Sequence, residues 1–244
     1  MRLRTLQCPV PGLPEELAGL RIAHLSDFHL GVPSRGARAV ERAVEWTAAR
    51  RPDLVCVTGD MLTRPEGLAR ARELLARLPG AVVVLGNHDI GIAKDPQAAR
   101  SDHLDLGDVR VLRDEALAVD VRGHRVQLVG VDPGSVLRRR ARPHELADAG
   151  ADLRILLSHF PKIVDALEPD AFALILAGHL HDGQINIPYG AGKLRLGSPH
   201  ARYPRGLYRT PTGMLHVSAG LGTTFVPFRF FARPEATELL LQPA

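Results

Sequence analysis

The sequence contains few cysteines, which excludes one class of protein. Only 2 of its 244 residues are cysteine. Two thiols cannot build the disulfide framework of a small secreted domain. Cys56 lies within an apolar run, where a cysteine usually acts as a small buried hydrophobe. We therefore expect a chain that suits a reducing compartment.

Long hydrophobic runs are also missing. No stretch approaches the ~20 apolar residues that a membrane-spanning helix needs. The first 20 residues lack the apolar centre of a secretory signal. We expect a soluble, cytoplasmic protein that would reach a lipid substrate only as a peripheral protein at the membrane surface.

The sequence has no strong charge imbalance. Its 31 Lys and Arg residues against 27 Asp and Glu give a formal net charge of +4. This excess permits an anionic substrate or an acidic membrane but requires neither. The longest basic run, at 138–140, is typical of a solvated turn, and the scattered charges do not predict specific nucleic-acid binding. No feature indicates a protein partner.

The composition and the spacing of apolar residues predict one α/β domain over residues 1–244. Hydrophobic residues make up 45% of the chain, and no repeat or linker interrupts it. Amphipathic segments after Ser34 and after Pro65 predict helices between the first strands, which indicates a mainly parallel sheet. Short apolar runs predict buried strands at 20–26, 53–58, 81–85, 153–158 and 171–177.

The middle and the last quarter of the chain show a different pattern. Residues 116–131 form two apolar stretches around a glycine turn, which predicts an antiparallel hairpin. Short strand-like runs separated by Pro and Gly follow after residue 190. We therefore expect two sheets within the one domain.

Polar side chains follow every one of the five predicted parallel strands. The carboxyl edge of a parallel sheet is where open α/β folds bind ligands. One such motif alone is more often a turn, but five with the same chemistry indicate a shared site. In chain order, these residues are Asp27 and His29, Asp60, Asn87 with His88 and Asp89, His159, and His179 with His181.

The chemistry of these residues predicts a metal centre. Carboxylate, amide and imidazole donors without a thiolate suit Mn, Fe, Zn or Ni. Seven donors are too many for one tetrahedral ion and fit two ions that share a carboxylate. Such a pair, ~3.5–4 Å apart, stabilises the attacking and leaving oxygens of a displacement at phosphorus.

The ordered motifs resemble those of the calcineurin-like metallophosphoesterases. They are Asp27-x-His29, Gly59-Asp60, Gly86-Asn87-His88-Asp89, His159 and Gly178-His179-x-His181. The resemblance extends from about residue 21 to the C-terminus. The stretches "GHLHDGQINIP" and "AGLGTTFVPFRF" resemble the branch with YkuE- and YaeI-type phosphodiesterases and UDP-2,3-diacylglucosamine diphosphatases. This resemblance implies a four-layer α/β/β/α sandwich.

The resemblance also implies a role for each motif residue. One metal would be held by Asp27, His29 and His181. The other would be held by Asn87, His159 and His179, and Asp60 would bridge the two. Water activated by two divalent ions, Mn²⁺ first and Fe, Zn or Ni as alternatives, would be the nucleophile. His88 would be catalytic by stabilising or protonating the leaving oxygen, and Asp89 would either orient His88 or cap the following turn.

The implied function is hydrolysis of a phosphodiester or pyrophosphate bond in a phosphate-ester substrate. UDP-2,3-diacylglucosamine or a related lipid-linked nucleotide is one candidate substrate. A nuclease or cyclic-nucleotide phosphodiesterase and a non-catalytic metal-binding scaffold of the same fold remain alternatives. We expect Leu180 and Asp182, which replace the usual Thr and Gly of the branch, to alter the surroundings of the metal ligands.

Three further features leave alternatives open. Any of four basic residues could bind phosphate: Arg64, Lys162, Arg202 and Arg205. The segment 225–231 contains four phenylalanines and is either an interior strand and turn or an apolar rim for a membrane or acyl chains. The remaining histidines are expected to be structural or on the surface: His24, His103, His124, His144, His200 and His216.

Overall fold

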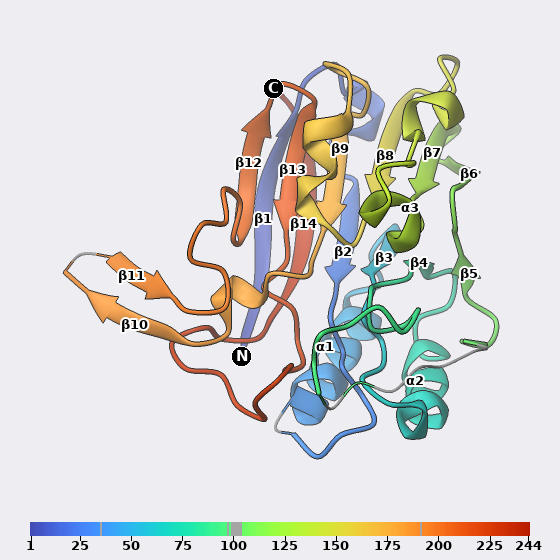
Figure 1. The fold of residues 1–244 in the computed structure, drawn as a ribbon. Coiled ribbons are helices and arrows are strands. Elements are labelled where there is room, and N and C mark those ends of the chain that lie inside the picture. Colours follow the sequence, from blue (N-terminus) through green and yellow to red (C-terminus); the bar gives the residue numbers. More distant parts are fainter. Residues whose placement is uncertain (35, 97, 99–103, 191) are drawn as a thin grey trace.

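Two six-stranded sheets form the centre of the molecule (Figure 1). The structure is a computed structural model and describes residues 1–34, 36–96, 98, 104–190 and 192–244. In spatial order, the first sheet contains β1 (Arg2–Val10), β14 (Glu235–Pro243), β2 (Arg21–Leu25), β3 (Leu54–Thr58), β4 (Val82–Val84) and β5 (Arg110–Val111). The second contains β12 (Gly206–Thr210), β13 (Gly213–Val217), β9 (Leu174–Ala177), β8 (Leu153–Leu157), β7 (His124–Gly130) and β6 (Glu115–Val121).

A shared apolar core lies between the two sheets. Successive side chains of a strand point to opposite faces, so every second residue of the inner strands reaches this core. Ile22 and Val82 of the first sheet and Leu174 and Leu176 of the second belong to it, all less than 4% exposed. Burial of these faces holds the sheets together and fixes the relative positions of their edges.

Helices cover the outer face of each sheet. On the first sheet, Val40 and Val44 of α1 (Gly36–Arg50) pack in one cluster with Ala23 and Leu25, and α2 (Leu68–Leu75) joins them. On the second sheet, α3 (Pro133–Leu137) and short 3-10 turns at Pro143–Leu146 and Pro161–Ala166 form the cover. The expected α/β/β/α layering is therefore confirmed, with a second helical layer made of short pieces.

Most predicted elements are present, with strand ends shifted by at most three residues. The five parallel strands are observed, and β6 and β7 form the expected antiparallel hairpin. The sequence patterns missed β1, which pairs in parallel with β14 at the other end of the chain. They also missed β10 (Asn186–Tyr189), which pairs with β11 (Gly192–Arg195) in a small separate hairpin. Within the described ranges, no helix is both long and apolar enough to cross a membrane.

Candidate metal centre

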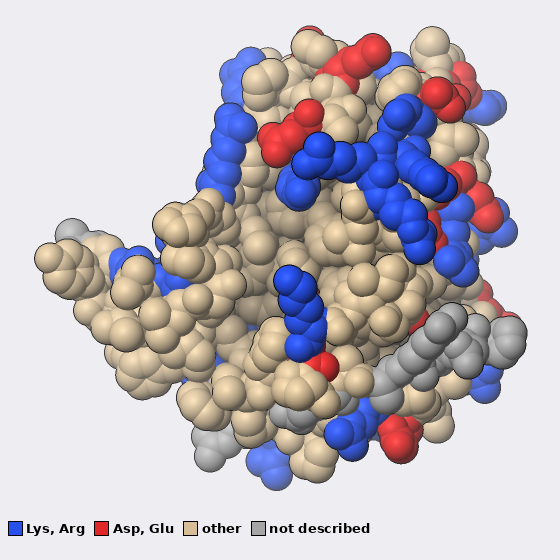
Figure 2. All heavy atoms as spheres, viewed as in Figure 1, with Lys and Arg blue, Asp and Glu red and all other residues tan. Residues whose placement is uncertain are grey.

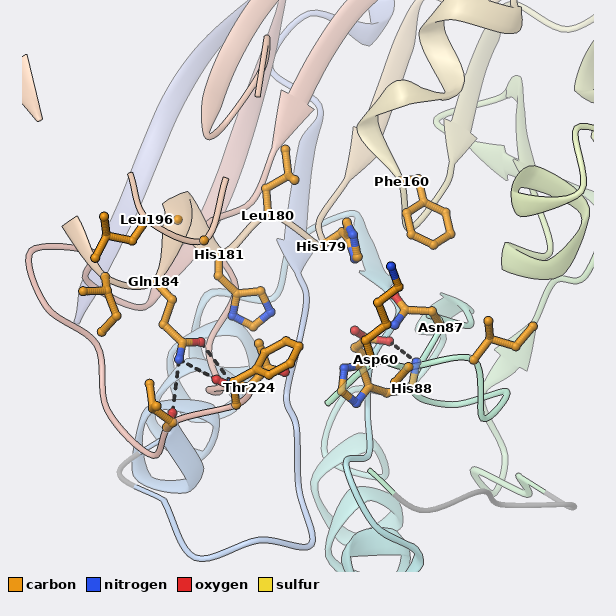
Figure 3. Close-up of a pocket in the computed structure, with 18 of the residues that line it drawn as sticks. Asp60, Asn87, His88, Phe160, His179, Leu180, His181, Gln184, Leu196 and Thr224 are labelled. Carbon is orange, nitrogen blue, oxygen red and sulfur yellow. Dashed lines mark hydrogen bonds between the residues drawn. The ribbon is translucent and has the colours of Figure 1, made fainter. Parts of the chain in front are cut away.

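All seven predicted metal ligands converge where the two sheets present the carboxyl ends of their parallel strands. They come from the loops after β2, β3 and β4 of the first sheet and after β8 and β9 of the second. Figure 3 shows His179 and His181 on one side of the site, with Asp60, Asn87 and His88 on the other. The packing of the sheets thus brings five separate strand ends together.

One group of donors consists of Asp27, His29 and His181, all buried. The Nε2 atoms of His29 and His181 are 3.1 Å apart. The same Nε2 of His181 is 3.3 Å from Asp27 Oδ1. Three donor atoms from two loops, after β2 and after β9, therefore face one point, as a metal ion requires.

A second group lies beside the first and shares Asp60 with it. His159 Nε2 is 3.1 Å from both Asn87 Oδ1 and His179 Nδ1. Asp60 Oδ2 is 3.2 Å from His159 Nε2 and 3.6 Å from His29 Nε2. A single carboxylate oxygen thus lies between the two groups, where a bridging ligand would be expected.

Hydrogen bonds to the other atoms of these residues fix their orientation. His159 Nδ1 is 2.9 Å from the Thr58 carbonyl oxygen, to which it donates, so its Nε2 lone pair faces the site. The backbone N–H of His88 donates to Asp60 Oδ1 at 2.9 Å, which leaves Oδ2 toward the donors. The backbone N–H of His179 donates to both carboxylate oxygens of Asp27 at 3.2 Å.

The electrostatics of the centre favour bound cations. Burial lowers the pKa of His179 to about 3 and that of His29 well below its usual value, so both rings are neutral, the form that coordinates metals. Burial alone would raise the pKa of Asp60, but the neighbouring His159 lowers it well below its ordinary value. His159 shows the converse: burial lowers its pKa, yet Asp60 raises it to about 9. A positive charge is thus favoured beside Asp60. The neutral imidazoles and the carboxylates together fit two divalent ions.

The sequence comparison agrees with this geometry. Residues 20–183 match the family model described as calcineurin-like phosphoesterase. The chain belongs to this family. It is therefore a phosphoesterase, a hydrolase, and the Asp and His clusters lie within or at the end of the matched region.

Relatives over nearly the whole chain carry similar names. The metallophosphoesterase YkoQ of Bacillus subtilis is 27% identical, with 93% of this chain and 84% of the relative covered. The phosphodiesterase YaeI of Escherichia coli is 24% identical over the same shares. A Bos taurus protein named transmembrane protein with metallophosphoesterase domain is 30% identical. The match covers 98% of this phosphoesterase and 57% of the length of that relative.

A cavity of about 960 Å³ opens above the metal centre of the phosphoesterase (Figure 3). Its floor contains Asp60, Asn87, His88, His179 and His181. Its walls are largely apolar and include Ile92, Leu137, Phe160, Leu180, Ile185, Leu196, Phe225 and Val226. The cavity therefore combines a polar floor that can hold phosphate with walls that suit an apolar group.

The four predicted phosphate-binding cations do not line this cavity. Arg205 lies 3.6 Å from Asp182 and 3.8 Å from Glu235, and Arg202 lies 3.7 Å from Asp165. Among the described residues, the cation that lines the cavity is Lys94, which the sequence interpretation missed. Its signal was its position in the loop that follows the Asn87 motif.

His88 and Asp89 have distinct surroundings. His88 lines the cavity, and its ring packs edge-on against that of His29 with centroids 4.6 Å apart. Its Nδ1 is buried without a hydrogen-bond partner in the described part of the chain. Asp89 instead accepts from the backbone N–H groups of Gly86 at 2.9 Å and Leu62 at 3.0 Å. Asp89 therefore neither contacts the His88 ring nor caps the following turn. It connects the loop that carries Asn87 to the loop that carries Asp60.

The departures from the usual motif have different consequences. Leu180 lines the cavity, so it affects the substrate side of the centre. The Asp182 carboxylate is buried and pairs with Lys193, with Arg195 at 3.1 Å and with Arg205 at 3.6 Å. Asp182 thus attaches the β10–β11 hairpin to the loop that carries His181.

The phenylalanine-rich segment is a loop on the surface. The interior interpretation of 225–231 is wrong, because its four phenylalanines are between 48% and 61% exposed. Arg229 lies between them and directs its guanidinium inward. Its Nη2 is 3.0 Å from His181 Nδ1, and its Nη1 donates to the Ala219 carbonyl oxygen at 2.8 Å. Arg229 lies in the stretch "AGLGTTFVPFRF" that carries the family resemblance, which gave it no role, and it contacts the predicted metal ligand His181.

The described histidines outside the motifs do not enter the centre. His24 and His216 are buried between the sheets with their Nδ1 atoms 2.7 Å apart, and His24 Nε2 lies 2.8 Å from Thr58 Oγ1. Burial lowers the pKa of His24 to about 3. This pair is structural, as expected, while His103 lies outside the described residues.

Proposed function

We propose that the chain hydrolyses a phosphodiester or pyrophosphate bond with two divalent ions in this centre. The observation that supports this most directly is Asp60 Oδ2, which lies between two donor groups on the floor of an open cavity. Mn²⁺ is the ion we propose, and Fe, Zn or Ni suit the same donors. Bound there, the ions would acidify a water and neutralise phosphate charge.

The ligand roles follow from the two groups. Asp27, His29 and His181 would hold one ion, and Asn87, His159 and His179 the other, with Asp60 shared. Thr58 and Arg229 would keep two of the imidazoles oriented. These contacts hold the ligand rings in place, so that substrate binding need not reorganise them.

His88 is the proposed catalytic residue. It faces the cavity beside Asp60 and His29 but makes no side-chain hydrogen bond with either. An imidazole in this position can donate a hydrogen bond to a phosphate oxygen or give a proton to the leaving oxygen. Within the described residues, its buried Nδ1 forms no hydrogen bond, so no protein contact there competes with such a role.

The cavity walls favour a substrate with an apolar group next to its phosphate. Phe160, Leu180 and Val226 can pack against such a group, while Lys94 can pair with a second negative charge. A lipid-linked nucleotide such as UDP-2,3-diacylglucosamine has both features. The name of the relative YaeI, a phosphodiesterase, supports diester chemistry in general.

Initial hydrolysis rates test this proposal. Wild type and His88→Ala would be chelated, reloaded with Mn²⁺ and assayed with p-nitrophenyl phosphate, bis-p-nitrophenyl phosphate and UDP-2,3-diacylglucosamine. We expect metal-dependent cleavage of the diester and a decrease of about 10²–10⁴-fold in kcat for the variant, the usual size of a lost acid–base contribution. His200→Ala, an exposed histidine outside the cavity lining, is the control.

The other outcomes separate the alternatives. Two bound metals without turnover of any substrate would overturn the proposal in favour of a non-catalytic scaffold. Diester cleavage without detectable UMP release would exclude the lipid-linked nucleotide and leave the diesterase. Equal rates for wild type and His88→Ala would remove the proposed role of His88.

A further inference from the structure

One face of the β10–β11 hairpin is apolar and about half or more exposed to solvent. Ile187 pairs with Leu194 in the strand register, so Ile187, Tyr189, Leu194 and Leu196 point to the same face. Their side chains are 47%, 83%, 50% and 51% exposed, respectively. The hairpin projects from the body of the molecule (Figure 1). This amount of exposed apolar surface on a projecting element is typical of an interaction site.

The adjacent loop exposes aromatic rings and turns a charged residue inward. Phe228, Phe230 and Phe231 are 52%, 48% and 61% exposed. Between them, Arg229 donates to the Gly222 carbonyl oxygen at 2.8 Å and contacts His181. A soluble surface usually shows the opposite arrangement, with arginine outside and phenylalanine inside. Because Arg229 is held by the centre, the neighbouring phenyl rings are displayed to the outside.

Backbone hydrogen bonds join the hairpin and this loop into one surface. The N–H of Asn186 donates to the Phe230 carbonyl oxygen at 2.8 Å, and the N–H of Phe230 donates to Gln184 at 2.9 Å. Asn186 Nδ2 also donates to the Phe231 carbonyl oxygen at 3.1 Å. We define the apolar rim as Ile187, Tyr189, Leu194, Leu196, Phe225, Phe228, Phe230 and Phe231.

The apolar rim continues into the substrate cavity. Leu196 and Phe225 belong to the rim and also line the cavity. Ile92 and Leu137, from two other loops, are 45% and 48% exposed and line it as well. Half-exposed apolar side chains from four segments therefore surround the approach to the metal centre.

Unpaired basic residues stand beside the same opening. Arg138, Arg139 and Arg140 directly follow Leu137 and are exposed, and none of them forms an ion pair with a described residue. Lys94 is exposed and lines the cavity. In Figure 2, Lys and Arg side chains gather over α3 at the border of the hollow in this face. An apolar surface next to unpaired cations is complementary to a bilayer that contains anionic lipids.

We propose that this face docks on an anionic membrane surface, with the apolar rim at the boundary between headgroups and acyl chains. Arginines 138–140 contact the lipid headgroups. A bilayer fits better than a protein partner, because a protein on the rim would cover the cavity, whereas a bilayer can supply an amphiphilic substrate to it. Docking itself does not depend on catalysis, but delivery of such a substrate rests on the proposed function.

Vesicle co-sedimentation of the full chain tests the docking. The probes are phosphatidylcholine vesicles with and without phosphatidylglycerol. We expect binding to the anionic vesicles that weakens with added salt. Partitioning of the double variant Tyr189→Ser, Phe228→Ser should fall about tenfold or more, since two aromatic side chains no longer enter the boundary. Arg139→Glu with Arg140→Glu should abolish the preference for phosphatidylglycerol.

A matched control and a soluble substrate distinguish the outcomes. Leu3 is exposed but lies on β1 outside the rim, so Leu3→Ser should bind vesicles like wild type. The Tyr189 and Phe228 variant should still cleave bis-p-nitrophenyl phosphate, because neither residue lines the cavity. Absent vesicle binding, or binding that these substitutions leave unchanged, would overturn the docking. A wild-type dimer that the double variant converts to monomer would overturn it in favour of a second copy on the rim. The vesicle-binding and oligomer results do not depend on whether the chain hydrolyses a diester.

Discussion

Backbone conformation at single residues shapes the metal centre. Five of the seven proposed ligands have positive φ, a region that L-residues seldom adopt: Asp27, His29, Asp60, His179 and His181. Each such residue costs of order 1 kcal/mol or more. Hydrogen bonds between loops offset this cost, since Asp27 N–H donates to the Gly59 carbonyl oxygen at 2.9 Å and His29 N–H donates to that of Asp60 at 3.0 Å. The fold therefore fixes the ligand loops in a conformation that short peptides would avoid.

Two motif glycines leave the space that the aspartates need. A Cβ at residue 86 would overlap the Asp60 carboxylate, and a Cβ at residue 178 would overlap Ser26 Oγ. Neither glycine has positive φ, so the requirement is close approach rather than backbone freedom. The glycines of "GNHD" and "GHLH" are thus part of the centre although they contribute no ligand.

At the residue scale, Asn87→Ala should remove one metal and spare the other. Asn87 belongs only to the group with His159 and His179, whereas Asp60 lies between both groups. Loss of the amide ligand should lower the metal affinity of the second site by at least about 10-fold, the lower end of the usual loss when a residue that supports a metal ligand is removed. Metal analysis after gel filtration should give about one ion for Asn87→Ala and none for Asp60→Ala. Two tightly bound ions in Asn87→Ala would contradict the ligand assignment.

At the scale of elements, the β10–β11 hairpin depends on one buried carboxylate. Asp182 has φ 51°, which places its side chain against Lys193 and Arg195 of β11. Arg205 reaches the same carboxylate and also Glu235 on β14. The hairpin is therefore joined to the His181 loop and to the first sheet through a network of charges.

Asp182→Asn should loosen this hairpin. It removes the charge that three cations share, and we expect a loss of about 1–3 kcal/mol in the free energy of unfolding, because those cations retain partial contact with water. Urea unfolding measures the change. Asp165→Asn is the control, since Asp165 is exposed and its pair with Arg202 is 3.7 Å long. Equal stability of wild type and Asp182→Asn would show that the network adds nothing.

The elements differ in how well the sequence predicts them. Strands β2, β3, β4, β8 and β9 are buried on both faces and appear as near-continuous apolar runs. Strand β1 mixes charged, polar and apolar residues without a regular apolar pattern, and its partner β14 lies at the other end of the chain, so no local pattern reveals the pairing. The hairpin exposes its apolar side chains, which contradicts the assumption that such residues face a core.

At the scale of the whole molecule, the metal centre connects the two sheets. Its proposed ligands come from loops of both, and the Asp27 and Asp60 carboxylates are buried among them. Bound ions would therefore stabilise the native arrangement of the two sheets in addition to serving the reaction.

Removal of metal should lower the thermal stability of the chain. A ligand present at a thousand times its Kd raises the free energy of unfolding by about 4 kcal/mol. For a domain of this size, loss of that contribution on chelation should lower the Tm by roughly 10 °C. Scanning calorimetry of the Mn²⁺-loaded and chelated protein measures it. The Asp60→Ala variant should show no difference between the two conditions. Identical Tm values for the wild type would indicate that the centre does not hold metal tightly.

The sequence by itself determined the donor set and the family. Each ligand motif directly follows a short apolar run, so local patterns are sufficient to place Asp27, Asp60 and His159 at strand ends. The same local patterns could not show which donor atoms lie next to one another in the shared site.

Only the tertiary structure decided the contacts between distant segments. Asp60 Oδ2 lies between donors from two sheets, and Arg229 reaches His181 across 48 residues of sequence. The exposure of Phe228 and Tyr189 likewise depends on what packs around them. Such contacts arise from the closure of the two sheets on one another, which no short stretch of sequence specifies.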